Sequence, residues 1–140
     1  MSRTKYLVIS GSNINLVANQ KTADQGLQDA HAALAATAAS LDVSVDCHQF
    51  KHKDDMVTCL QNAPKDYAGV MINTAGMSDY KDALCRTIES MLLPCIEVFT
   101  SHTDTHHNAV IAPVCMGVIG GFGEQSYSLG LAALVHLHKQ

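Results

Sequence analysis

Short apolar runs alternate along the chain with longer segments whose apolar residues recur three and four positions apart. The short runs are rich in β-branched residues and are expected to be strands, at 6–9, 43–50, 69–72, 95–99 and 114–119. The longer segments are expected to be helices, at 24–41, 54–62, 80–92 and 126–138. The runs place apolar residues on both faces of a strand, which is typical of a parallel sheet covered by helices on both sides.

This alternation of strand and helix predicts a doubly wound α/β fold. Right-handed crossovers make a flavodoxin-like, five-stranded parallel sheet with helices on both faces the expected topology. No repeat, low-complexity tract or linker interrupts the pattern, so residues 1–140 are expected to form one domain. In such a fold, ligands bind beyond the carboxyl ends of the strands, where the strand order reverses.

Composition narrows the function classes. The chain is 47% hydrophobic and 16% charged, and this low charge content suggests that other subunits cover part of its surface. A net charge of −4 gives no electrostatic case for nucleic acid. The five cysteines are widely spaced with no CxxC pair, as expected for reduced thiols packed as small hydrophobic residues. No signal peptide or membrane span is apparent, so the cytoplasm is the expected compartment.

Polar residues that directly follow the expected strands are the candidates for a site. Asn13 and Asn73 could bind a ligand, or they could be turn and capping residues whose side chains bond nearby backbone. Glu97 lies inside an apolar strand, and because buried carboxylates are rare unless paired, a functional or structural partner is expected. Neither a dinucleotide fingerprint nor a phosphate loop is present, and no cofactor is expected.

The histidine-rich segment 102–107 suggests a metal site at first sight. In an extended conformation His102, Asp104 and His106 would share one face and could ligate zinc or another divalent ion. A solvated loop without a fixed ion is the more common reading of dense histidine on a loop, so no metal is expected here.

Five motifs, in order along nearly the whole chain, resemble the type II 3-dehydroquinate dehydratases. That family has Gly-Pro-Asn-Leu-Asn-Leu after the first strand, where residues 11–16 read Gly-Ser-Asn-Ile-Asn-Leu. The family pattern Asp-x-x-Gln-x-Asn-His-Glu is matched in part by Asp46, Gln49 and His52. Residues 72–75 match Ile-Asn-Pro-Gly in part, and residues 94–101 match Pro-x-x-Glu-Val-His-Leu-Ser in part. Residues 117–123 match Gly-Val-Ile-x-Gly-Phe-Gly.

The resemblance implies an anti elimination of water through an enolate. In the family, a deprotonated Tyr on a mobile lid removes the proton beside the ketone, and a neighbouring Arg keeps that Tyr anionic. An Asn holds a water that stabilises the enolate, and a His paired with a Glu returns a proton to the leaving hydroxyl. A base tuned by a cation, an acid oriented by a carboxylate and an anion-binding site agree with the general rules of such catalysis.

Several of these groups are missing from this sequence. The lid, expected at 17–26, is short and contains neither Tyr nor Arg, although Lys21 could supply a positive charge. By the same resemblance, the family's substrate-facing Tyr falls at Met77, its catalytic His at Asp79 and a second His, after the Glu, at Phe99.

Two further family features also differ. The Arg-His-His segment that holds the substrate is shortened, and only His106 and His107 remain of it, in the loop 102–108. The Asp that the family contributes from a neighbouring subunit becomes Arg86. The family forms trimers that assemble into a dodecamer, so a homo-oligomer is expected.

The retained positions Asn13, Asn73, Glu97 and Ser101 are expected to keep a small-molecule pocket. The first interpretation is a diverged lyase-like enzyme that acts on a small polyhydroxylated or carboxylated metabolite, with Asp79 and Glu97 sharing a proton and Asn13 assisting. Substrate binding is then expected from Asn73, Ser101, Arg86, His106 and His107. A non-catalytic binding or regulatory protein, and a dehydroquinate dehydratase with substitute groups such as Lys21, are the alternatives.

Overall fold

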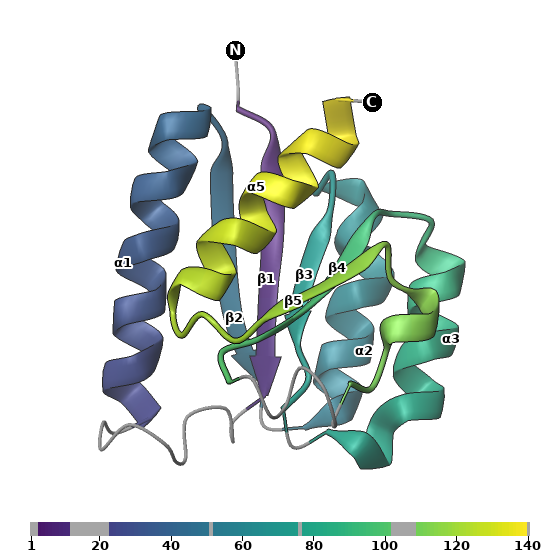
Figure 1. Ribbon diagram of the computed structural model, residues 1–140. Coiled ribbons are helices and arrows are strands. Elements are labelled where there is room, and N and C mark those ends of the chain that lie inside the picture. The colour runs from purple at the N-terminus through teal and green to yellow at the C-terminus, as the bar shows by residue number, and fades with distance from the viewer. Residues whose placement is uncertain (1–2, 12–22, 51, 76, 102–108, 140) are drawn as a thin grey trace.

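The sheet of the computed structural model has five parallel strands in the order β2-β1-β3-β4-β5 (Figure 1). The structure describes residues 3–11, 23–50, 52–75, 77–101 and 109–139. The strands are β1 (Lys5–Gly11), β2 (Ser44–Phe50), β3 (Val70–Asn73), β4 (Cys95–Phe99) and β5 (Gly117–Gly120). The helices are α1 (Ala23–Leu41), α2 (Lys53–Asn62), α3 (Lys81–Met91) and α5 (Gln125–Lys139). The expected flavodoxin-like, doubly wound α/β fold is confirmed.

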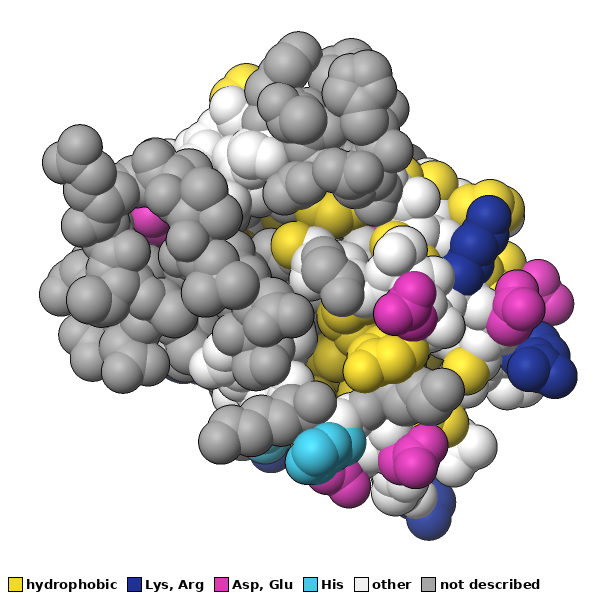
Figure 2. All heavy atoms as spheres, turned by 90° about the horizontal axis from the view of Figure 1, so that it is seen from below, with side chains coloured by type: hydrophobic (Ala, Val, Ile, Leu, Met, Phe, Trp, Pro, Cys, Tyr) yellow, Lys and Arg dark blue, Asp and Glu magenta, His cyan; other side chains and the backbone are white. Residues whose placement is uncertain are grey.

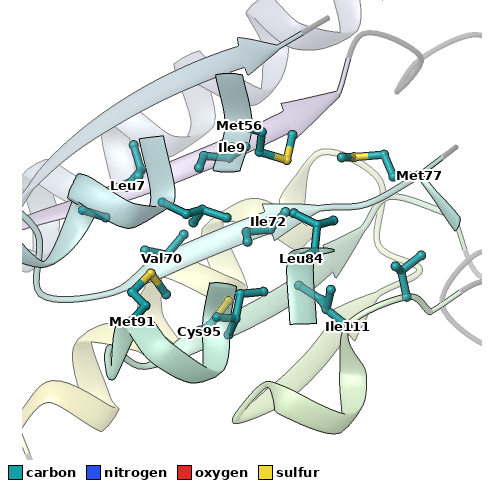
Figure 3. Packing of buried hydrophobic residues seen from close by; sticks show 14 residues of the cluster. Leu7, Ile9, Met56, Val70, Ile72, Met77, Leu84, Met91, Cys95 and Ile111 are labelled. Atoms are coloured by element: carbon teal, nitrogen blue, oxygen red, sulfur yellow. The ribbon is translucent and has the colours of Figure 1, made fainter. Parts of the chain in front are cut away.

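Helices cover both faces of the sheet, so successive residues of a strand enter different cores. Tyr6 and Val8 of β1 are buried on the side of α1 and α5, whereas Leu7 and Ile9 are buried on the side of α2 and α3. Figure 3 shows the second core, in which side chains from β1, β3 and β4 meet those of the two helices. Burial on both faces explains why the strands read as continuous apolar runs.

Helix α5 approaches the sheet closely at Gly130. A Cβ added there would overlap the sulfur of Met71 on β3. Glycine at this position therefore lets the helix backbone lie directly over the strand, although glycine costs about 1 kcal/mol of helix propensity relative to alanine. This contact sets the height of α5 above the centre of the sheet.

Most element boundaries differ from those expected by one or two residues, and the last strand differs by more. The last strand begins at Gly117 rather than at 114, because Ala112–Val114 forms a 3₁₀ turn that contains Pro113. Ser78–Tyr80 is likewise a 3₁₀ turn that precedes α3. Helix α3 ends where Leu92 adopts a left-handed conformation with φ of 59°.

The strand order reverses between β1 and β3, which places the switch point at their carboxyl ends. Ser10 pairs with Asn73 in the register of these two strands. The carboxyl ends of all five parallel strands point to the same edge, the lower edge in Figure 1. Ligands of doubly wound sheets bind beyond this edge, and the candidate site is therefore sought there.

Candidate active site

Asn73 lies at the switch point and is almost fully buried. Its Oδ1 accepts a hydrogen bond of 2.9 Å from the backbone N–H of Ala75, and its Nδ2 donates one of 2.8 Å to the hydroxyl of Tyr127. The first bond is the local turn contact that was one of the two readings of this residue. Asn73 thus joins the end of β3 to α5, and its bonds to described residues leave one amide hydrogen for another acceptor.

Tyr127 is a residue of this region that sequence reasoning did not identify. It lies on α5 within an apolar helix pattern, so nothing in the spacing distinguishes it from an ordinary core residue. Burial raises the pKa of Tyr127 well above its ordinary value, while the hydrogen bond from Asn73 acts in the opposite direction. The phenol is therefore neutral at physiological pH.

Glu97 is fully buried on β4, and its carboxylate is the polar centre of the site. Three groups donate to the same oxygen, Oε2: the hydroxyl of Thr74 at 2.6 Å and the backbone N–H groups of Val110 at 2.7 Å and Ile111 at 3.2 Å. Among the described residues, the other oxygen, Oε1, has no hydrogen-bond partner. Glu97 therefore ties the segment before β5 to the end of β3, and one buried acceptor is left over.

Phe99 follows Glu97 by two positions on β4 and is also fully buried. Residues two apart on a strand point to the same face of the sheet, so the phenyl ring lies on the side of Glu97. Ser101, half-buried, follows the end of the strand. A hydrocarbon ring next to a buried carboxylate offers it neither a proton nor a hydrogen bond.

Asp79 occupies a different environment from Glu97. It is exposed on the turn before α3, and no hydrogen bond joins the two carboxyl groups, both of which lie in the described part of the chain. Met77 is buried, and its sulfur would be 3.1 Å from a Cβ placed on Gly11 at the end of β1. Arg86 is exposed on α3, where its Nε donates to the carbonyl of Asp82 at 3.3 Å.

The remaining candidates, Asn13, Lys21, His106 and His107, lie outside the described residues. So do His102 and Asp104 and most of the expected lid. Figure 2 looks onto the edge at which the strands end, and hydrophobic side chains are visible there beside acidic ones. The described residues contain no group of three or more metal-ligating side chains.

Two cavities formed by described residues lie away from these candidates. One, of about 820 Å³, runs between α1 and β2, and the other, of about 480 Å³, lies at the amino edge of the sheet near Lys5 and Lys65. None of the candidate residues in the described part of the chain lines either of them. Among the helices whose residues are described, none is long and apolar enough to cross a membrane.

The motifs at the ends of β1, β3 and β4 have a match among known families. The family model for class II dehydroquinase covers residues 4–135. The chain belongs to this family.

Relatives and solved structures agree with this membership. The chain is 34% identical over 143 residues to a 3-dehydroquinate dehydratase of Acaryochloris marina, covering 97% of this chain and 96% of the relative. It is 35% identical to one of Desulforudis audaxviator, covering 95% and 93%. The crystal structure of a type II dehydroquinase from Propionibacterium acnes superposes with a TM-score of 0.80 at 27% identity, covering 95% of this chain and 98% of that one.

Membership in the class II dehydroquinase family explains why the polar residues gather at this edge. Asn73 ends β3, Glu97 lies within β4 and Ser101 follows it, and the fold pairs these two strands. The sequence resemblance to the family is thereby confirmed. The chemical roles of the individual residues remain predictions.

Proposed function

We propose that this class II dehydroquinase-like protein binds a small polyhydroxylated or carboxylated metabolite at the carboxyl ends of β1, β3 and β4, and acts on it as a diverged lyase. Efficient dehydration of 3-dehydroquinate is not expected. The observation that carries the proposal is the state of Glu97, whose carboxylate is fully buried. One of its oxygens accepts three hydrogen bonds, and the other has no partner among the described residues.

A buried acceptor without a donor is costly, and native structures keep few of them. The unpartnered Oε1 of Glu97 is therefore suited to receive a hydrogen bond from a ligand hydroxyl or from an acidic proton in transfer. Asn73, at the switch point, offers a remaining amide hydrogen to an oxygen of the same ligand. A ligand hydroxyl can donate to Oε1 of Glu97, and a hydroxyl or carboxylate oxygen of the same ligand can accept from Asn73.

The divergence rests on groups that the sequence lacks. No Tyr lies between Tyr6 and Tyr67, and no Arg between Arg3 and Arg86, so the lid has neither base nor cation of the family type. Phe99 replaces the second family His beside Glu97 and cannot transfer a proton. One general acid or base typically contributes roughly 10² to 10⁴ in rate, and losing several together should remove most of the family's dehydration activity.

Asp79 is the proposed replacement acid, and Asn13 is proposed to assist it. The exposure of Asp79 on the turn before α3 leaves its carboxyl group accessible to a ligand at this edge. We assign substrate binding to Ser101, His106 and His107 from the resemblance, and Arg86 to the neighbouring subunit's pocket, where its guanidinium would bind an anionic group.

The exposed β5 edge supports association with further copies of the chain. Met116 and Phe122 are each more than half exposed, and Val118 on β5 is partly exposed. Such apolar side chains along an unpaired strand are typical of a surface that a partner covers. The proposed partner is a second copy of this chain, with no role for nucleic acid or membrane.

The experiment is a thermal-shift and turnover screen of purified protein against hydroxylated and carboxylated metabolites, with Asp79→Asn and a matched control, Asp82→Asn. Both aspartates are exposed near the start of α3. For any compound that is turned over, Asp79→Asn should abolish turnover and Asp82→Asn should not. Equal activity of the Asp79→Asn variant would refute its role as the acid. A non-catalytic binding protein would be supported instead if the parent turned over none of the compounds and the Asp79→Asn variant bound the same compound with an affinity within a few-fold of the parent's.

Dehydration of 3-dehydroquinate is the second candidate function. The observation in its favour is the identity of 34–35% to relatives that are 3-dehydroquinate dehydratases, over nearly their whole length. Such activity would require a substitute base, for which Lys21, His106 and His107 are the candidates. The same assay includes this compound and separates the two functions.

A further inference from the structure

The fold brings two cysteines that are 20 residues apart in the sequence into direct contact. The thiol of Cys115 donates to the sulfur of Cys95, with 3.7 Å between the two sulfurs. Cys95 begins β4, Cys115 precedes β5 by two positions, and the backbone N–H of Met116 donates to the carbonyl of Cys95 at 2.8 Å. The backbone segments that carry Cys95 and Cys115 are therefore already held side by side.

The geometry requires little change to form a bond. A disulfide has an S–S length of about 2.05 Å and joins residues whose Cβ atoms lie roughly 3.5–4.5 Å apart. The two sulfurs lie 3.7 Å apart, so they must approach by less than about 2 Å to reach that length. None of the other described thiols has a second sulfur as its hydrogen-bond partner.

Access to the two thiols differs. Cys95 is buried, with 1% of its surface exposed, whereas Cys115 is half-buried. The contact with Cys115, together with burial and the nearby charge of Glu97, raises the pKa of Cys95 well above its ordinary value. Cys115 is thus the thiol that a reagent reaches first, and Cys95 is the neighbour that can complete the reaction.

We propose that Cys95 and Cys115 form a dithiol site that is oxidised to a disulfide by low-molecular-weight disulfides such as glutathione disulfide. The Cys115 sulfur attacks the reagent, breaks its S–S bond and releases one reduced thiol. The Cys95 sulfur then attacks the Cys115 sulfur of the mixed disulfide and releases the second thiol. Two cysteine thiols are oxidised, one external disulfide is reduced, and both protons end on the released thiols.

The cross-link would close a loop that contains Glu97 of the candidate site. Glu97 lies two residues after Cys95, and its hydrogen bonds hold Val110 and Ile111, which precede Cys115. A disulfide joining the ends of this segment restricts the unfolded chain and the local opening of the segment. Oxidation should therefore raise the unfolding temperature and slow the exchange of the Val110 and Ile111 amide hydrogens.

The test incubates the folded full-length protein with glutathione disulfide at about pH 8, where exchange between thiols and disulfides proceeds readily. Intact mass and peptide mapping should show the loss of two hydrogens and a Cys95–Cys115 cross-link. The Cys95→Ser variant should instead retain glutathione on Cys115, and the Cys115→Ser variant should form no cross-link. Cys47→Ser, which removes a thiol outside the pair, should react like the parent.

Three outcomes would overturn the proposal. They are a cross-link that maps to another pair, a glutathione adduct on Cys115 that persists in the parent protein, and five free thiols after prolonged incubation. Amide hydrogen exchange of the parent, which needs no variant, shows whether the protein remained folded during the reaction.

Discussion

Replacing Glu97 tests the assignment of its hydrogen bonds, with three donors on Oε2 and none among the described residues on Oε1. Glu97→Ala removes the acceptor of three hydrogen bonds and leaves the hydroxyl of Thr74 and the N–H groups of Val110 and Ile111 without a partner. Glu97→Gln keeps one carbonyl oxygen for these donors. Its NH₂ group can occupy the position of Oε1, where no hydrogen bond is lost.

The expected magnitudes differ between the two substitutions. Each buried donor left unsatisfied costs about 1–3 kcal/mol, and because water can enter the vacated space, Glu97→Ala should cost roughly 3–5 kcal/mol. Glu97→Gln replaces charge-assisted hydrogen bonds by neutral ones but also removes a buried charge, so its cost should be about 0–2 kcal/mol. For a domain of this size, roughly 3 °C of melting temperature corresponds to 1 kcal/mol.

Urea unfolding at neutral pH measures these differences, with Glu89→Ala as the matched control. Glu89 is exposed on α3, and its substitution should change the free energy of unfolding by less than about 0.5 kcal/mol. Equal destabilisation by Gln and Ala would show that Oε1 of Glu97 has a donor of its own in solution, and would refute the reasoning on the spare acceptor.

Two further predictions concern packing and titration. Gly130→Ala should destabilise the protein by about 1–2 kcal/mol in urea unfolding, because overlap with Met71 outweighs the gain in helix propensity, whereas Gly117→Ala, with open space at its Cβ, should be milder. Burial, aided by the charge of Asp46, raises the pKa of Cys47 from its unfolded value of 9.0 to about 11. Its contribution to stability should be complete below pH 9.0 and lost as the pH rises to about 11, so Cys47→Ala should flatten the decline of unfolding free energy in that range.

The fold could be predicted from the sequence because the hydrophobic pattern and the general rules of chain connection favour the same topology. Apolar runs such as 6–9 and 95–99 favour a sheet buried on both faces, and right-handed crossovers make the flavodoxin-like topology the expected one. Boundaries were less accurate where backbone chemistry overrides the pattern. Pro113 places a turn in what looked like the start of a strand.

The site was predictable only in part. Glu97 was identified because a carboxylate within an apolar strand needs a partner, but its donors, two backbone N–H groups and a hydroxyl, have no signature in the sequence. Tyr127 was missed because its contact with Asn73 joins residues 54 positions apart. The contact of Cys95 with Cys115 likewise depends on the pairing of neighbouring strands.

The central claim is that the pocket is retained while efficient dehydroquinate dehydration is lost. The most direct measurement follows formation of the conjugated enone from 3-dehydroquinate by the purified protein, together with the thermal shift that the compound causes. The account predicts a shift with no turnover in the usual enzyme range of about 1–10³ s⁻¹. The Phe99→His variant, which places an imidazole on the same face of β4 as Glu97, should gain binding or residual activity. Turnover of the parent protein at an ordinary enzymatic rate would contradict the account and establish it as a dehydratase with substitute catalytic groups.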